Sequence, residues 1–142
     1  MNFKYLQMKQ FLLIIFFACT SIAAFTQSRI GFSASEIKTE FWERQYNLKE
    51  SFDTSNRYYI AIKTKRANVA YVFDEKQFCT ITYIFPLDQG ALNFYVELYN
   101  SRYVVAGLNQ WKMYSNGGVS EILLIYPESG GYFFAWRSLN QN

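Results

Sequence analysis

The segment RYYIAIKTKRANVAYVFDEKQFCTITYIF, residues 57–85, contains three short runs that are rich in β-branched and aromatic residues. The runs Arg57–Thr64, Asn68–Phe73 and Phe78–Phe85 have the composition and length of strands. Lys65–Ala67 and Asp74–Gln77 are polar and separate them. This segment therefore predicts an antiparallel three-strand meander, which fixes the type of fold.

A helix is expected on each side of this meander along the chain. Ser33 and Glu36 have the spacing of a capping box before a helix that should bury Ala34, Ile37 and Phe41. This helix is expected to end near Gln45 or Tyr46. Asp88 is expected to cap a second helix that runs to about Asn100.

A second set of strands follows the second helix. Three are predicted, at Gln110–Ser115, Val119–Tyr126 and Tyr132–Ser138, with Asn116–Gly118 as a tight hairpin; Tyr103–Leu108 has no clear assignment. The expected fold is α+β, with two helices packed on one antiparallel sheet of about six strands in the order α-βββ-α-βββ. One helix and three strands in each half of the chain suggest an internal repeat of pattern.

Residues 1–26 have the features of an export signal. Lys4 and Lys9 precede an apolar run from Phe11 to Ala18, which is shorter than the ~20 residues of a spanning helix. Cleavage is expected after Thr26, or alternatively after Ala23 or Ala24. The expected organisation is thus a signal peptide, residues 1–26, and a single α+β domain, residues 27–142, without a transmembrane span and located in the periplasm or outside the cell.

Cys19 gives an alternative to simple cleavage. Ala18-Cys19 resembles the small-residue-then-Cys site at which bacterial lipoproteins are cut and acylated. Phe16 and Phe17 stand where such sites usually carry Leu and a small residue, so lipidation at Cys19 is the minor alternative.

The composition of the expected mature chain limits the partners, catalytic groups and metal sites that it can have. Without residues 1–26 it has 12 basic and 11 acidic residues, a net charge of +1, which favours neither nucleic acid nor an anionic membrane as a partner. Histidine is absent from the sequence, which excludes Ser-His-Asp and Cys-His catalysis and His-based zinc sites. Cys79 is the one remaining cysteine, and alternation predicts it buried beside Ile81, Tyr83 and Phe85 and unreactive. No cofactor and no metal site are expected.

Charged groups offer little catalytic potential. Glu36, Glu40 and Glu43 lie on one side of the first predicted helix, and Glu40 can pair with Arg44 at i,i+4, so a solvated face is expected. The basic cluster Lys63, Lys65 and Arg66 at a hairpin is expected to keep an edge soluble. The pairs at Gly117–Gly118 and Gly130–Gly131 lie between predicted strands and are expected in turns.

Aromatic residues are the unusual component. Twenty-three of the 116 residues after position 26 are Phe, Trp or Tyr, more than a modest core needs. Alternation divides the strand aromatics into two sets, one with Tyr58, Tyr71, Phe73, Tyr83 and Phe85 and the other with Tyr59, Phe78, Tyr114, Tyr126, Tyr132 and Phe134; Thr80 and Thr82 fit the solvated face.

These aromatics lead to the functional prediction. An exported, non-enzymatic binding protein is expected, with Trp111, Tyr114 and Trp136 as contacts to another protein through a free sheet face or an edge strand. A carbohydrate- or lipid-binding protein with an aromatic groove between helix and sheet is the alternative. The third alternative is a small enzyme that uses carboxylates or tyrosine alone.

Two resemblances accompany this interpretation. Gln89-Gly90-Ala91-Leu92-Asn93-Phe94-Tyr95-Val96, together with Gln110-Trp111-Lys112-Met113-Tyr114 and the Gly117-Gly118 turn, resembles uncharacterised small secreted proteins of Gram-negative bacteria, which implies export but no known activity. The order of elements is similar to that of type III secretion chaperone-like proteins and of exported β-lactamase inhibitor proteins. This is a similarity of fold order and implies no function by itself.

Overall fold

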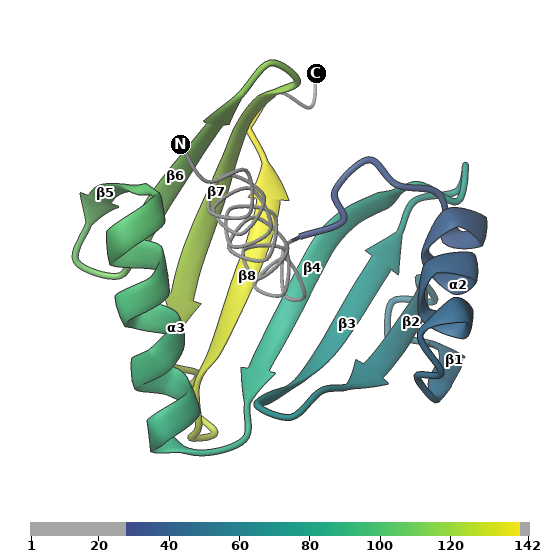
Figure 1. Ribbon diagram of the computed structural model, residues 1–142, viewed down its shortest axis with the longest axis horizontal. Coiled ribbons are helices and arrows are strands. Elements are labelled where there is room, and N and C mark those ends of the chain that lie inside the picture. Colours follow the sequence, from purple (N-terminus) through teal and green to yellow (C-terminus); the bar gives the residue numbers. More distant parts are fainter. Residues whose placement is uncertain (1–27, 140–142) are drawn as a thin grey trace, which may run out of the picture.

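A computed structural model describes residues 28–139 and shows an aromatic-rich α+β domain (Figure 1). Both predicted helices and six predicted strands are present, and two further strands occur. The elements are α2 (Ala34–Glu43), β1 (Leu48–Phe52), β2 (Tyr58–Lys63), β3 (Ala67–Phe73), β4 (Cys79–Pro86), α3 (Gln89–Arg102), β5 (Val104–Gly107), β6 (Gln110–Ser115), β7 (Gly118–Ile125) and β8 (Phe133–Ser138).

The prediction of about six strands in the order α-βββ-α-βββ is wrong. All eight strands form one antiparallel sheet in the order β1-β2-β3-β4-β8-β7-β6-β5, so each helix is followed by four strands. The additional strands are β1 and β5, which are the two edges of the sheet. Each pairs with a neighbour on one side, so neither needs the hydrophobic alternation by which inner strands are recognised.

The helices begin where their caps predict. Ser33 Oγ accepts a hydrogen bond from the Glu36 amide at 3.3 Å, and the Glu36 carboxylate accepts one from the Ser33 amide at 2.8 Å, so the capping box of α2 is present. Asp88 Oδ1 accepts from the Ala91 amide at 2.8 Å and caps α3. These bonds satisfy amide groups that the first turn of a helix leaves without partners.

Strands β4 and β8 join the two halves of the sheet at its centre. They pair antiparallel from Ile81↔Arg137 to Ile84↔Phe134. The segment that precedes α2 lies along the start of β4. The Gly31 amide donates to the Cys79 carbonyl at 2.8 Å, and the Cys79 amide donates to the Phe32 carbonyl at 2.8 Å. The two four-strand meanders thus become one continuous sheet.

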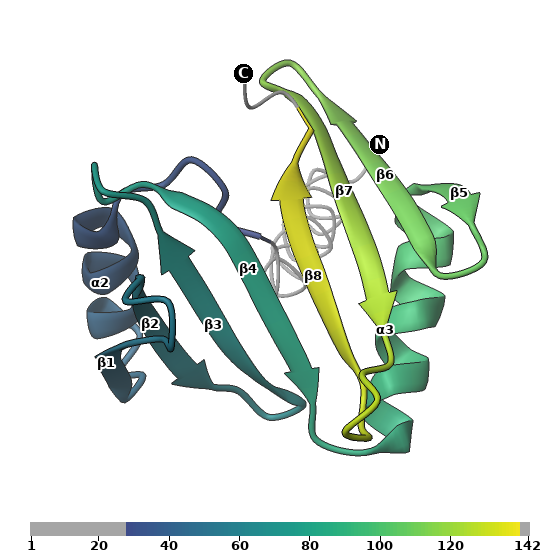
Figure 2. The same cartoon turned by 180° about the vertical axis from the view of Figure 1, so that it is seen from behind.

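Both helices lie on the same face of the sheet, α2 over β1–β2 and α3 over β6–β8 (Figures 1 and 2). The strand register places one row of side chains on this face across seven strands: Ile60, Tyr71, Thr82, Trp136, Ile122, Trp111 and Val105. All except Val105 are buried. Ile37 and Phe41 of α2 and Leu92, Tyr95 and Tyr99 of α3 complete the same core.

Two expectations about the side chains of β4 are wrong: a β-bulge at the start of the strand reverses the side of Cys79, and the helices cover the side of Thr82 instead of that of Ile81 and Tyr83. The register shifts between Val72 and Phe73, so Val72 pairs with Ile81 but Phe73 pairs with Cys79. Cys79 therefore lies on the helix side, with its Sγ 3.6 Å from Thr82 Oγ1, and not beside Ile81 and Tyr83. Thr82, expected on the solvated face, is buried in the core row.

Candidate functional site

The sheet face opposite the helices, called here the open face, has no helix of residues 28–139 over it (Figure 2). Alternation away from the buried core row places on it a set of apolar side chains that continues across β3, β4, β8 and β7. We call this set the central patch: Val72, Ile81, Tyr83, Phe85, Leu123, Ile125, Phe133 and Ala135. Of this set Phe85 is exposed, Val72 and Ala135 are buried by their neighbours, and the other five are partly exposed. Contiguous exposed apolar surface often marks a binding site.

Three aromatic rings form the middle of the central patch. The centroid of the Phe133 ring lies 5.7 Å from that of Tyr83 and 5.5 Å from that of Phe85, and Tyr83 and Phe85 are 6.2 Å apart. Phe85 is exposed, while Tyr83 and Phe133 are half-buried by one another. Ala70 and Ala135 pair with Tyr83 from its two neighbouring strands. Because both side chains are small, the Tyr83 ring stands above the sheet surface on either side of it.

A charged cross-strand row borders the central patch on β6, β7 and β8. Glu121 is buried on this face and lies between Lys112 and Arg137 in the strand register. Arg137 donates to Glu121 Oε2 from both Nε (2.6 Å) and Nη2 (2.5 Å), and the Gln110 amide hydrogen-bonds Glu121 Oε1. Paired in this way, the Glu121 carboxylate is satisfied by neighbours and fixes the guanidinium at the edge of the patch.

Three lysines surround the central patch on the same face. Lys49 of β1, Lys63 of β2 and Lys112 of β6 occupy open-face positions of the register. Arg57 and Arg137 are also there, but each is in an ion pair, with Asp53 and Glu121 respectively. The open face is thus apolar at its centre and carries an excess of positive charge at its margins.

The structure separates the three residues that the sequence analysis expected to contact a partner. Trp111 and Trp136, with 3% and 0% of their surface exposed, lie in the core row on the helix side and cannot contact a partner. Trp111 Nε1 donates to Asn100 Oδ1 at 2.8 Å and Trp136 Nε1 to Tyr99 Oη at 3.3 Å, so both indoles are fixed to α3. Tyr114 alone is exposed, at 62%, and lies on the open face near the β6–β7 hairpin.

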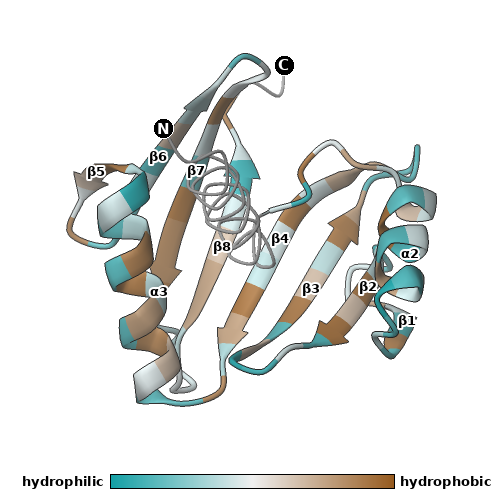
Figure 3. Cartoon of the chain, in the orientation of Figure 1, coloured by the Kyte–Doolittle hydropathy of each residue, from teal (hydrophilic) through white to brown (hydrophobic). Residues whose placement is uncertain are grey.

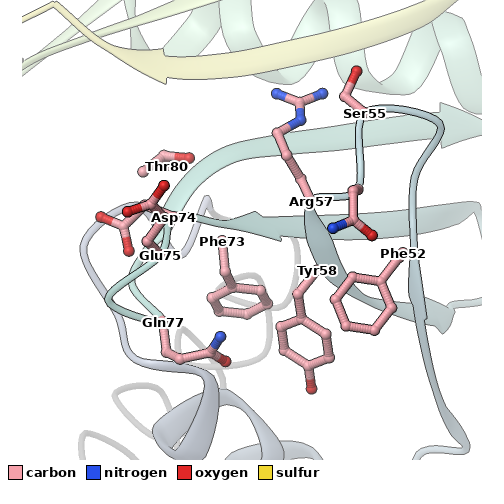
Figure 4. A pocket seen from close by; sticks show the side chains of 10 residues that line it. Phe52, Ser55, Arg57, Tyr58, Phe73, Asp74, Glu75, Gln77 and Thr80 are labelled. Carbon is pink, nitrogen blue, oxygen red and sulfur yellow. The ribbon is translucent and has the colours of Figure 1, made fainter.

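A pocket of about 810 Å³ lies where the β1–β2 and β3–β4 hairpins meet (Figure 4). Phe52, Tyr58 and Phe73 form a row of rings along one side of it, with centroids 5.7 and 5.3 Å apart. The close-up shows the three rings pointing together, while Arg57 extends from the opposite side of β2. Asp74, Glu75 and Gln77 add polar groups at the rim.

The acidic and basic clusters have structural roles. Glu36 caps α2, and Glu40 forms an ion pair with Arg29 at 2.7 Å and a longer one with Arg44 at 3.6 Å, as the i,i+4 spacing predicted. Asp74 Oδ1 accepts from the amides of Lys76 and Phe78, both at 2.9 Å, and so shapes a turn. No group of metal-ligating residues is found in the described part of the chain.

The β2–β3 hairpin reaches the second helix through its basic cluster. The Arg66 guanidinium lies 3.8 Å from the centre of the Phe94 ring on α3, a cation–π contact across the two halves. Lys63 and Lys65 are exposed beside it. Gly130 and Gly131 adopt positive φ angles between β7 and β8, as predicted, whereas Gly117 lies in the β6–β7 turn without a positive φ and Gly118, with a positive φ, is the first residue of β7.

Cys79 is a buried thiol, as the sequence analysis expected, although it faces the helices. Burial raises its pKa to about 11, against the smaller opposing effect of its hydrogen bond with Thr82. A thiol with a raised pKa is protonated near neutral pH, and the thiolate is the reactive form. The structure therefore gives Cys79 a packing role.

No protein-family model, curated protein or solved structure matches this chain. Within residues 28–139, neither helix has the length and apolar character needed to cross a membrane. The predicted export signal, its expected cleavage sites and Cys19 lie outside the described residues. The open face and the pocket between the β1–β2 and β3–β4 hairpins, called here the hairpin pocket, are the two candidate sites. The residues of the open face could not be predicted from the sequence, because alternation alone does not say which side of a sheet the helices cover.

Proposed function

We propose that this chain is an exported interaction protein that binds another protein through the open face of its sheet. The observation that carries the proposal is the central patch, where Tyr83, Phe85 and Phe133 cluster on a face that no helix of residues 28–139 covers. Aromatic side chains that are held in place by neighbours offer a large contact area at a small loss of side-chain entropy, which is why they dominate binding energies at protein interfaces.

The charges around the patch define the partner further. Lys49, Lys63 and Lys112 lie at its margins. A partner with an apolar contact surface bordered by carboxylates would match this arrangement, and the lysines would speed its association. The rate of association should therefore fall as ionic strength rises, while the rate of dissociation, set mainly by the aromatic contacts, should change little.

Substitution of Phe85 tests the proposal. Phe85→Glu places a charge in the aromatic cluster of the patch at an exposed position, so the fold should be retained. We expect the affinity for the partner to fall at least tenfold, as for a central interface residue. Proteins that remain bound to the chain after isolation from its own cells identify the partner, and calorimetry with the purified components then measures the affinity.

Trp42→Glu is the matched control. Trp42 is an exposed aromatic residue of α2, on the helix side of the molecule, and the substitution adds the same charge. Affinity should be unchanged by it. Equal binding by wild type and Phe85→Glu, or an equal loss with both variants, would contradict the proposal.

The hairpin pocket supports a second candidate function, the binding of a carbohydrate. The ring row of Phe52, Tyr58 and Phe73 offers apolar faces for sugar C–H groups, and Asp74, Glu75 and Gln77 offer hydrogen-bond partners for hydroxyl groups. Titration of soluble oligosaccharides, followed by calorimetry, distinguishes the two functions. Binding that Phe52→Ala abolishes and Phe85→Glu leaves intact would favour the carbohydrate; the reverse pattern with a protein partner would favour the open face.

A further inference from the structure

The two edges of the sheet differ in how they are protected from pairing with another strand. Strand β1 carries Lys49 and Glu50, and Glu50 forms an ion pair with Lys38 of α2 at 2.8 Å and accepts a hydrogen bond from the Tyr58 hydroxyl. Charged side chains on an edge strand disfavour pairing, because the charges would have to be desolvated or brought against like charges. The β1 edge is therefore protected.

Strand β5 has no charge to protect it, although it is only four residues long and its register with β6 shifts between Val105 and Gly107. From Val104 to Leu108 the chain reads VVAGL, without a charged residue, and every one of these residues is exposed. Val104, Val105 and Leu108 are 55%, 59% and 97% exposed. The hydropathy colouring shows β5 as a brown strand at the outer end of the sheet (Figure 3). Among residues 28–139, β6 is the one strand that pairs with β5, so its other side presents free backbone groups.

We propose that β5 is a dimerisation edge, at which two copies of this chain pair antiparallel about a twofold axis. This inference goes beyond the proposed function, because it concerns an edge of the sheet and not its open face. Twofold pairing joins the same surface of both copies, so it succeeds when that surface is compatible with itself. An uncharged apolar strand meets this condition, since its copy brings no like charge opposite it.

The asymmetry of the two edges also limits the assembly to two copies. Pairing of β5 with β5 leaves the two β1 edges, with their charges, at the ends of the joined sheet. Head-to-tail pairing of β5 with β1 would extend without limit, but it would bury Lys49 or Glu50 against apolar side chains. In the dimer the two open faces become neighbours on one continuous surface.

The length of β5 sets the expected strength. Four paired residues span about 13 Å, so the contact is small and the dimer should dissociate on dilution. Sedimentation equilibrium of the purified chain over a wide concentration series should show the mean mass rise from one chain to two and stop there. Hydrogen exchange of the amides at 104–107 should slow at the concentrations where the dimer forms, while exchange in β1 should not change.

Val104→Glu tests the edge directly. The new carboxylate faces Lys112 within its own chain, which favours folding, but in the dimer it has to lose solvent against the uncharged apolar strand of the copy. We expect this variant to remain a monomer at every concentration. Ser51→Glu is the matched control, because Ser51 and Val104 are the two ends of one open-face row across the eight strands; this variant should dimerise like wild type.

Three outcomes would overturn the proposal. A wild-type chain that stays monomeric at the highest concentration shows that β5 does not pair with its copy. A dimer that persists in Val104→Glu, with unchanged exchange at 104–107, places the contact elsewhere. Dissociation of the dimer by Ser51→Glu and Val104→Glu alike would assign it to the open face and not to the edge.

Discussion

The ion pair between Arg29 and Glu40 fastens the segment before α2 to that helix. Arg29 Nη2 and Nε donate to the two oxygens of Glu40 at 2.7 and 2.9 Å, and both side chains are largely shielded from solvent. The hydrogen bond from Arg29 holds the pKa of the Glu40 carboxyl below its ordinary value of 4.5, against a smaller effect of burial. The pair therefore stabilises the fold when Glu40 is ionised.

We predict a pH-dependent effect of Glu40→Gln. Because the pKa is lower in the folded state than in the unfolded state, the stabilisation is complete above pH 4.5 and is lost as the pH falls through the lowered folded value. At neutral pH the variant should be less stable by about 1 kcal/mol, and the difference should disappear in acid. Urea unfolding at a series of pH values measures it.

Glu43→Gln is the control for this prediction. Glu43 lies on the same helix and is exposed, so its substitution should leave the free energy of unfolding unchanged at every pH. A loss of stability in Glu40→Gln that remains constant into acid would show that the charge of Glu40 is not its cause.

At the scale of residues, the sequence could predict the aromatic surplus but not its division between the two faces. Simple alternation groups Tyr71 with Tyr83 and Phe85, whereas the bulge at the start of β4 puts Tyr71 in the core and the other two on the open face. One additional residue in a strand reverses every later side chain. The assignment of Trp111 and Trp136 to the surface failed for a related reason, since both faces of their strands carry large side chains.

At the scale of elements, the cap of α2 carries a further prediction. Ser33→Ala removes the hydroxyl that accepts from the Glu36 amide, while the helix itself keeps its buried residues. We expect a loss of about 1 kcal/mol in the free energy of unfolding, the usual effect of removing an N-cap side chain. Thr39→Ser, on the exposed side of the same helix, should change stability by less than half as much in the same urea titration.

Helices and inner strands could be predicted because local signals define them. Both caps and the six inner strands lie within one or two residues of their predicted positions. The exceptions, β1 and β5, are edges: LKESF is polar and four of its five residues are exposed, and β5 is only four residues long. Their strand conformation comes from backbone pairing with β2 and β6, which no local pattern encodes.

At the scale of the whole molecule, the decisive contact is the pairing of β4 with β8, which are about fifty residues apart in the sequence. It creates one sheet from two meanders and places both helices on one side. Side chains link those helices through the sheet: Phe41 stacks on Tyr71 at 5.8 Å, Tyr71 pairs with Thr82, Thr82 with Trp136, and Trp136 contacts Tyr99 at 5.6 Å. The two halves of the chain thus share one core.

This shared core predicts that the halves unfold together. Ile60→Val removes one buried methyl group from β2, in the first half, and should lower the free energy of unfolding by about 1 kcal/mol. In a Trp42→Phe background, fluorescence reports Trp111 and Trp136 in the second half. If the domain unfolds as one unit, the urea midpoint of that fluorescence moves by the full effect of Ile60→Val, whereas Thr39→Ser on the exposed side of α2 leaves it in place. A fluorescence midpoint that does not move with Ile60→Val would mean that the β4–β8 pairing joins two independently stable units. The continuous core row could not then be the source of the domain's stability.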